Sequence, residues 1–313
     1  MTGVSGRCCR IGLDARGELP YMLEAMTETS SSLRLHAPEA APVPVVFDSP
    51  HSGTDDPADF GTIAPMATLR RAEDAFVDEL FGAAPAYGAP LIAARFPRIY
   101  IDPNRDLVDL DPAMLDGPWP DPLVPSRKTE LGVGLVWRIM PPDSRLYDRL
   151  LTVAEVRGRI ERCWKPYHRA VSDALDAAHR RFGKVWHVNC HSMPAVGNAA
   201  SEDGPVARAE FVLGDRDGTT CEAAFTAFVA AELRGMGYHV KINEPYKGVE
   251  LVRRYSDPAK GRHSLQLEVN RKLYMDEKTI EKNAGFGALQ ADLAKLVAAI
   301  CAYARAQVGA HSA

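Results

Sequence analysis

The chain has 313 residues, of which 46% are hydrophobic and 25% are charged. This length and this balance are typical of one large globular domain or two small ones. The formal net charge of −4 gives no general attraction to nucleic acid or to an anionic membrane surface, so neither is expected as a partner.

The segment TETSSSLRLHAPEAAPVP, from Thr27 onward, is rich in Ser, Ala and Pro and has no clear period, and we predict a weakly ordered or peripheral arm over residues 1–42. The arm lacks the apolar stretch of a signal peptide, and no part of the chain has the roughly 18 to 20 apolar residues that span a bilayer. The six cysteines match neither a zinc-finger nor a CxxC spacing. These features predict a cytoplasmic protein with reduced thiols.

From residue 43 to residue 313, short apolar runs alternate with helical patterns. We predict strands within 43–47, 89–96, 97–106, 184–194, 207–215, 238–246 and 263–275, and helices at 67–88, 146–182, 221–237 and 288–308. Residues 107–145 are rich in Pro, Gly and Asp and are predicted to be a long insertion that can cover a site. The alternation indicates a single α/β domain, a three-layer sandwich with a mostly parallel mixed sheet.

Five polar loops follow predicted strands. They read SPHSG, DPNRD, NCHSMP, PYKGVELVRRYSD and LEVNRK. Open α/β sheets build their sites at the carboxyl ends of their strands. These loops are therefore expected to meet around one site.

His51 and His191 are candidate metal ligands. Each follows an apolar strand, and each precedes a small residue, Ser52 or Ser192, that leaves room for a ligand. Two imidazoles and one carboxylate form a common open zinc site, with the remaining position left for water. A lone histidine is more often a hydrogen-bonded core or surface residue than a metal ligand. Two histidines in matching loops make the metal-site interpretation about as strong as that ordinary one.

The carboxylate ligand has four candidates in the segment after the first histidine, namely Asp55, Asp56, Asp74 and Asp78. Asp74 is placed at the beginning of the following helix, close to the preceding loop and favoured by the helix dipole. Asp78 comes four residues later and would share its helical face. Each acid is also an ordinary capping or solvated helix residue, so the residues alone leave the choice open.

Glu268 is a candidate general base because it lies inside an otherwise apolar strand, LQLEVNR. Burial there would raise its pKa and make it a better acceptor for a proton from water. The alternative is an exposed acid on an edge strand, and Gln266, on the same face, keeps that alternative open.

Arginines in the strand-end loops are candidates for binding a substrate carboxylate, because the guanidinium group pairs bidentately with carboxylates. They are Arg105, Arg253, Arg254 and Arg271. Asn104 would add a further donor beside Arg105. Solvated surface is the ordinary alternative for an arginine in a loop, and it is the default for Arg254.

Taken together and in this order, SPHSG, EDAFVDEL, RIYIDPNRD, HVNCHSMP, PYKGVELVRRYSDP and LQLEVNRKLYMDE resemble the N-formylglutamate amidohydrolase family over residues 43–277. This resemblance implies the hydrolysis of N-formyl-L-glutamate to formate and glutamate, in histidine degradation. The family is in turn similar to zinc carboxypeptidases, which implies a phosphorylase/hydrolase-like α/β fold and one zinc ion per chain.

The resemblance also implies roles for single residues. The implied zinc ligands are His51, Asp74 and His191, and the implied catalytic and substrate-binding residues are Glu268, Asn104, Arg105, Arg253 and Ser192. Asp74 is favoured as the acid because Thr54 stands where carboxypeptidases carry theirs, three residues after the first histidine.

The loop KGVELVRRY departs from the Gly-Gly and Arg-His that family members often carry there. Two alternatives to formylglutamate hydrolysis therefore stay open. The same metal site can act on another N-acyl amino acid or a short peptide, or the chain can be a non-catalytic binding protein of this fold.

Overall fold

The computed structural model describes residues 32–197 and 203–309, and its centre is a mixed sheet with the strand order β1-β3-β2-β6-β9-β7-β8. Four of the neighbouring pairs run parallel, while β1–β3 and β7–β9 run antiparallel. The strands are β1 Leu33–His36, β2 Val45–Ser49, β3 Leu91–Ala94, β6 Val185–Met193, β7 Phe211–Gly214, β8 Val240–Ile242 and β9 Arg262–Asn270.

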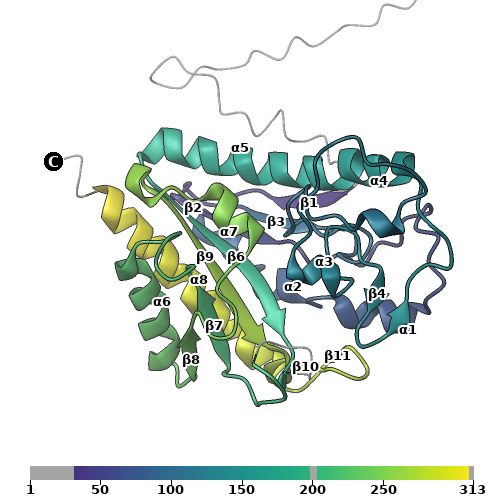
Figure 1. Cartoon of the computed structure of the whole chain (residues 1–313). Helices are drawn as coiled ribbons and strands as arrows, with labels where there is room; N and C mark the ends of the chain where they lie inside the picture. The colour runs from purple at the N-terminus through teal and green to yellow at the C-terminus, as the bar shows by residue number, and fades with distance from the viewer. Residues whose placement is uncertain (1–31, 198–202, 310–313) are drawn as a thin grey trace, which may run out of the picture.

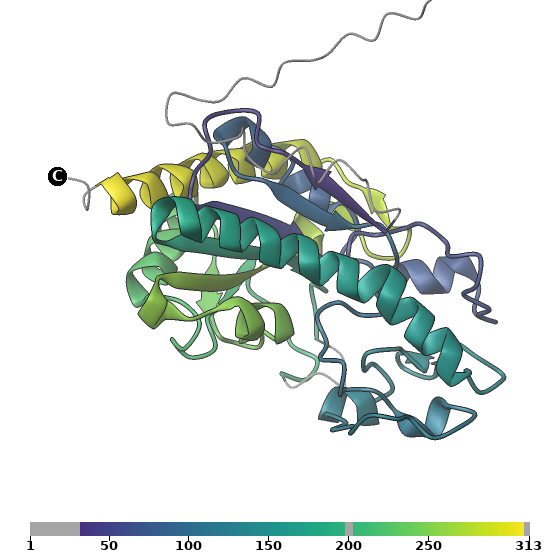
Figure 2. The same cartoon turned by 90° about the horizontal axis from the view of Figure 1, so that it is seen from above.

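Helices cover both faces of the sheet, as Figure 1 shows. One face carries α5 and α7, with α4 leading into α5, and the other carries α2, α6 and α8. In the view of Figure 2, α5 runs lengthwise over the sheet. These helices are α2 Val77–Leu80, α4 Val153–Arg159, α5 Lys165–Phe182, α6 Ala223–Gly235, α7 Glu250–Tyr255 and α8 Phe286–Gly309. The predicted α/β sandwich with a mostly parallel mixed sheet is confirmed.

The two faces of the central strands differ in polarity. The face toward α8 is apolar, and on β6 and β9 it consists of Trp186, Val188, Cys190, Leu265, Leu267 and Val269. Successive strand residues point to opposite faces, so the residues between them face α5 and α7. These are polar although they are buried: His187, Asn189, His191, Ser264, Gln266 and Glu268. A buried polar layer thus runs along the sheet toward the carboxyl ends of β6 and β9.

The helix predicted at 67–88 is wrong, because the chain is broken between α1 (Met66–Leu69) and α2. Phe76 has a φ of 64°, in the left-handed region, which interrupts any right-handed helix there. Two hydrogen bonds hold the break in place. The Asp74 amide donates to the His51 carbonyl at 3.0 Å, and Arg271 Nη2 donates to the Glu73 carbonyl at 2.6 Å. The polypeptide at Asp74 is therefore attached to the strand-end loop instead of to a helix.

The strand predicted within 97–106 is also wrong, since this segment forms turns after β3. Its apolar residues fill the core, and the Asp102 amide donates to the carbonyl of Leu135, outside the sheet, at 2.7 Å. Within the predicted N-terminal arm, β1 forms an edge of the sheet, and residues 1–31 lie outside the described residues.

The predicted insertion 107–145 is packed against the sheet domain. It contains the short elements α3 Arg127–Glu130, β4 Ile139–Met140 and β5 Ser144–Arg145. Leu110, Leu135 and Val136 are fully buried or nearly so in the same cluster as α5. Through Leu135 the segment supports the DPNRD loop, so it helps to position the residues of that loop. Its role as a cover stays a prediction.

Among the described residues, α8 is the helix long and apolar enough to cross a membrane by length and composition. Its apolar residues Leu289, Leu293, Leu296 and Ile300 are buried against the sheet. About 33% of its apolar window is buried inside the protein, and length and composition alone are weak evidence for a membrane span. A short hairpin, β10 Met275–Asp276 with β11 Glu281–Lys282, precedes the helix.

Candidate metal centre

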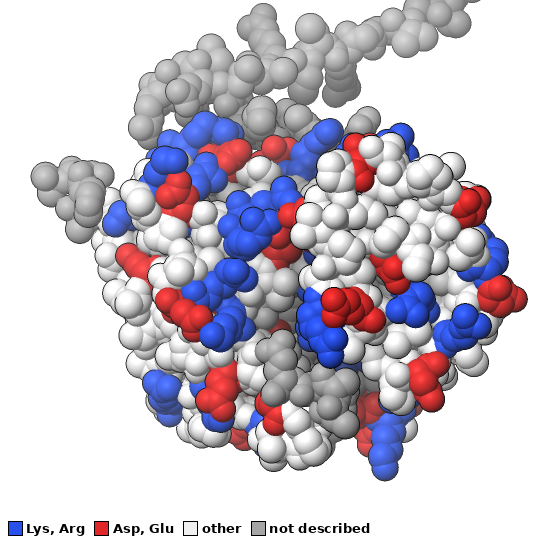
Figure 3. All heavy atoms as spheres, in the orientation of Figure 1, with Lys and Arg blue, Asp and Glu red and all other residues white. Residues whose placement is uncertain are grey.

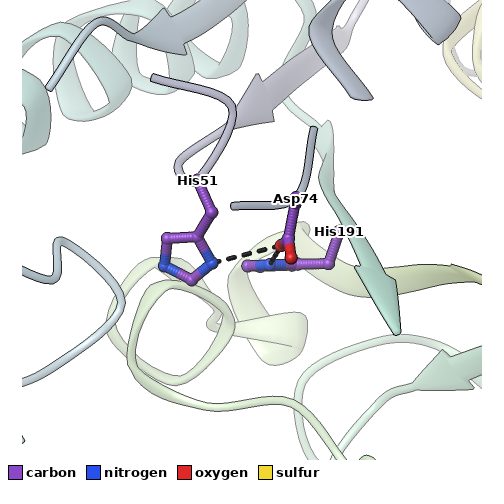
Figure 4. Close-up of side chains that lie close together, drawn as sticks. All are labelled: His51, Asp74 and His191. Atoms are coloured by element: carbon purple, nitrogen blue, oxygen red, sulfur yellow. Dashed lines mark hydrogen bonds and ion pairs between the residues drawn. The ribbon is translucent and has the colours of Figure 1, made fainter. Parts of the chain in front are cut away.

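Three side chains from separate segments meet at the carboxyl ends of β2 and β6 (Figure 4). His51 follows β2, His191 lies near the end of β6, and Asp74 lies in the break before α2. Asp74 Oδ2 is 3.3 Å from His51 Nδ1 and 3.0 Å from His191 Nδ1. All three side chains are buried, and their ligand atoms lie within 4.8 Å of one another. The three residues predicted as metal ligands are thus brought together, and their role as ligands stays a prediction.

The carboxylate of Asp74 is held ionised by its neighbours. Burial acts to raise its pKa, but the contacts with His191 and His51 and the charge of Arg98 outweigh burial and hold the pKa well below its usual range. Arg271 Nη2 also donates to Asp74 Oδ1 at 3.1 Å. Arg271, a candidate for binding substrate, is therefore used to fix the other oxygen of Asp74.

Asp102 determines which ring nitrogen of His51 is available to bind a metal. Asp102 Oδ1 lies 2.8 Å from His51 Nε2. Burial acts to raise the pKa of Asp102, but Arg98, then His51 and Arg105, hold it well below its usual range, so Asp102 is a carboxylate that can only accept hydrogen bonds. His51 Nε2 must then donate, and in the neutral ring, the form that binds a metal, the lone pair is on Nδ1, toward Asp74.

This donor set fits zinc. When the His51 ring is neutral, its lone pair faces the Asp74 carboxylate with no hydrogen between them, and a cation stabilises that arrangement. Two imidazole nitrogens and one carboxylate oxygen are the protein ligands of a common catalytic zinc site, and an acid on the outer ring nitrogen is its usual support. Asp102 stands in the DPNRD motif, but no pattern other than its place after the apolar residues 99–101 distinguishes it from the other acids.

Arg98 is a second functional residue that sequence reasoning missed. Its Nε and Nη2 donate to Asp102 Oδ2 at 3.2 and 2.8 Å, and its guanidinium lies 5.1 Å from the centre of the Trp137 ring. Its charge also lowers the pKa values of Asp74 and Glu268. Arg98 therefore balances the negative charge at the centre. In the sequence it is an arginine in a turn, with no pattern that distinguishes it from a solvated one.

Glu268 lies on an interior strand, directly opposite His191 in the β6–β9 pair, so the edge-strand alternative is excluded. Burial raises the pKa of Glu268 to about 7; interactions with His191 and Arg98 lower it in part, and Asp74 raises it further. Gln266 Nε2 donates to Glu268 Oε1 at 2.9 Å. A carboxyl group with a pKa near neutrality can both accept and return a proton.

Asn104 and Arg105 lie beside this centre. Asn104 Oδ1 accepts from the Leu251 amide at 2.9 Å, which directs its Nδ2 toward His191 at 3.3 Å. Arg105 is 7% exposed, and among the described residues its guanidinium hydrogen-bonds only the Asn104 and Val133 carbonyls. Burial lowers the pKa of Arg105, with Asp102 opposing that effect. A buried guanidinium without an ion pair of its own is suited to an anionic ligand.

Arg253 and Arg254 are placed differently. Lys and Arg side chains gather over α7 on the face seen in Figure 3. Both arginines pair with the buried Glu250, and Arg253 Nη2 also donates to Asp106 at 2.9 Å. These pairs attach α7 to the DPNRD loop. Substrate binding by Arg253 stays a prediction, and in this structure its guanidinium already has two acidic partners.

Ser192 and the alternative acids have other partners. Ser192 alternates with His191 along β6, and its hydroxyl accepts from Arg271 Nε at 3.1 Å. Asp55 accepts from Arg95 at 2.7 Å, and Asp78 lies 3.6 Å from Arg34. Neither acid belongs to the three-residue cluster among the described residues. Substrate binding by Ser192 likewise stays a prediction.

Comparison with known proteins gives a consistent result. Residues 43–275 match the family model of N-formylglutamate amidohydrolase. An N-formylglutamate deformylase of Pseudomonas aeruginosa is 29% identical over 82% of this chain and 90% of its own length, and one of Pseudomonas putida is 28% identical over 75% and 83%. The crystal structure of an N-formylglutamate amidohydrolase from Ralstonia eutropha JMP134 covers 88% of this chain and 99% of its own, at 51% identity and a TM-score of 0.85.

Proposed function

Because this chain belongs to the N-formylglutamate amidohydrolase family, whose members hydrolyse an amide bond, we propose that it converts N-formyl-L-glutamate to formate and L-glutamate with the help of one zinc ion. We place the reaction in histidine degradation in the cytoplasm, with a small carboxylate-bearing molecule as the partner and no nucleic acid or membrane. The observation that carries the proposal is the meeting of His51, Asp74 and His191 beside Glu268.

The three clustered side chains would hold the zinc ion through His51 Nδ1, His191 Nδ1 and Asp74. Zinc in such a site supplies Lewis-acid chemistry, making a water more acidic and polarising a carbonyl oxygen. Glu268 takes a proton from the attacking water and later gives it to the leaving amine of glutamate. Its burial beside His191 keeps the carboxyl near the pKa that suits both tasks.

Arg105 and Asn104 position the substrate in this proposal. Arg105 would pair with a carboxylate of glutamate, and the Asn104 amide would add a donor. Holding the substrate by a carboxylate fixes the formyl carbon over the centre, which saves the entropy cost of finding that geometry. The Arg105 guanidinium is buried and has no ion pair among the described residues, which supports this role.

Metal content and formate release, measured together on the purified protein with N-formyl-L-glutamate, test the proposal. We expect about one zinc per chain, and formate release that a chelator abolishes and added zinc restores. Bound zinc without formate release would contradict N-formyl-L-glutamate as the substrate. It would favour another N-acyl amino acid, the second candidate, because the loop KGVELVRRY departs from the pattern of the family. Formate release unchanged in the zinc-free protein would contradict the metal-dependent mechanism.

Replacing Arg105 by Ala is expected to raise KM for N-formyl-L-glutamate by roughly 10- to 100-fold, because a charge-assisted pair to a carboxylate contributes about 1.5–3 kcal/mol. The KM for a neutral analogue, N-formyl-L-norvaline amide, should rise much less in the same variant. Steady-state kinetics on both substrates measures the difference. Arg253→Ala tests the second candidate arginine, and an unchanged KM in that variant would leave the carboxylate contact to Arg105. An equal rise in KM for both substrates would show that Arg105 has a structural role.

A further inference from the structure

Behind His191 lies a group of buried polar side chains that the proposed reaction does not use. It consists of Asp48 on β2, His187 and Asn189 on β6, and Tyr167 on α5, all without exposed surface. Burying a carboxylate costs free energy unless it is paired and hydrogen-bonded.

Asp48 accepts hydrogen bonds from all three of its partners. Its Oδ1 lies 2.9 Å from His187 Nε2 and 2.8 Å from Asn189 Nδ2, and its Oδ2 accepts from the Tyr167 hydroxyl at 2.7 Å. Burial acts to raise the pKa of Asp48, but the charge of His187 and these hydrogen bonds hold it below its ordinary value. Asp48 is thus an ionised carboxylate, which accepts and cannot donate.

This fixes the direction of the Asn189 amide. Its NH₂ group must face Asp48, so its Oδ1 faces His191 Nε2, at 2.7 Å. An amide oxygen only accepts, and His191 Nε2 must carry the hydrogen. Asn104 Nδ2 also lies 3.3 Å from this nitrogen, but it cannot donate to a nitrogen that already holds a hydrogen. The lone pair of the neutral His191 ring is then on Nδ1, 3.0 Å from Asp74 Oδ2.

We propose that Asn189 and Asp48 are positioning residues of the metal centre: Asp48 orients the Asn189 amide, and Asn189 holds His191 with its proton on Nε2 and its Nδ1 toward the metal. The proposal rests on the zinc site of the proposed function and assigns a role to two residues that do not touch the substrate. His51 receives the same support directly from Asp102. Partners of this kind commonly set metal affinity in histidine sites.

Zinc affinity is the first test, measured by competition with a chromophoric chelator. Asn189→Leu removes both hydrogen bonds at similar volume and should weaken zinc binding by roughly 10- to 100-fold. Asp48→Asn should weaken it less, because an amide at position 48 no longer forces one orientation on Asn189. The matched control is Ser264→Ala, which removes the hydrogen bond to His187 Nδ1 at 3.1 Å and leaves Asn189 untouched. Zinc binding by Asn189→Leu equal to that of the wild type would overturn the proposal.

The tautomer of His191 is the second test, and it is measured on the wild-type protein. Long-range ¹H–¹⁵N correlation spectra of the zinc-loaded, ¹⁵N-histidine-labelled wild type distinguish a ring protonated on Nε2 from one protonated on Nδ1. The signals of His191 are assigned by their shift in Ser192→Ala. We expect the Nε2–H form, and the Nδ1–H form would overturn the proposal even where Asn189→Leu fails to fold.

Both tests are independent of turnover. A protein that binds zinc and releases no formate contradicts the proposed substrate and leaves the role of Asn189 open to confirmation by affinity and spectrum. A wild type with the wrong tautomer, or an Asn189→Leu variant with unchanged affinity, contradicts the positioning role whatever the kinetics with N-formyl-L-glutamate.

Discussion

Replacing Glu268 by Gln is expected to lower kcat for N-formyl-L-glutamate by roughly 10²- to 10⁴-fold, the usual contribution of a general acid–base group. Gln keeps the size of the side chain and cannot take a proton from water. Glu268 is not one of the three clustered ligand residues, so zinc content should remain at the wild-type level. Steady-state kinetics and metal analysis on the same preparation measure both quantities.

Glu268→Asp separates the chemistry of the carboxyl group from its position. It retains a carboxylate on a shorter side chain and should recover part of the lost rate. A Gln variant with a kcat near the wild type would show that another group is the base. Loss of zinc in the Gln variant would instead show that Glu268 is a metal ligand.

The same residue makes the metal-free protein sensitive to pH. Its pKa is about 7 in the folded protein against 4.5 for an unperturbed glutamate, so the folded form binds this proton more tightly than the unfolded chain does. Stability therefore falls as pH rises between these two values, by roughly 3 kcal/mol in all, and stays lowered above them. Glu268→Gln removes the effect. We therefore compare the melting temperatures of the metal-free Gln variant and the metal-free wild type at two pH values. The difference in favour of the variant should be larger at about pH 8 than at about pH 5.

Sequence patterns predicted the strand-end loops well because parallel neighbouring strands end at one edge of a sheet. His51 and His191 come from β2 and β6, which are paired in parallel, so two histidines in matching loops had to lie near each other. Glu268 followed from the same logic on β9. The alternation of His187, Asn189 and His191 between apolar residues was also visible in HVNCH, and it marks the buried polar face that holds Asn189.

Other parts depend on contacts that no local pattern records. The apolar spacing in 67–88 is typical of a helix, but the hydrogen bond from the Asp74 amide to the His51 carbonyl breaks it. Asp74 therefore reaches the centre through the break, and the predicted helix dipole has no part in it. Arg98 and Asp102 pair across a turn whose position is set by the packed segment 107–145. Such distant partners explain why neither residue was selected.

Replacing Asp74 by Asn is expected to weaken zinc binding by more than about 100-fold and to abolish metal-dependent formate release. Asn keeps the shape of the side chain but removes the negative charge that faces both histidines. It also leaves the buried guanidinium of Arg271 without its carboxylate partner, at Asp74 Oδ1. Chelator competition measures the affinity, and thermal denaturation of the metal-free variant shows whether the fold is retained.

Asp55→Asn and Asp78→Asn are the matched controls, because both acids were candidates for the third ligand. Asp55 is paired with Arg95 on the surface, and Asp78 lies near Arg34, so each substitution removes one charge outside the cluster. Both should bind zinc as the wild type does. A loss of zinc binding confined to Asp78→Asn would show that Asp78, and not Asp74, is the third ligand. The break in the chain at Asp74 would then have no role in the metal centre.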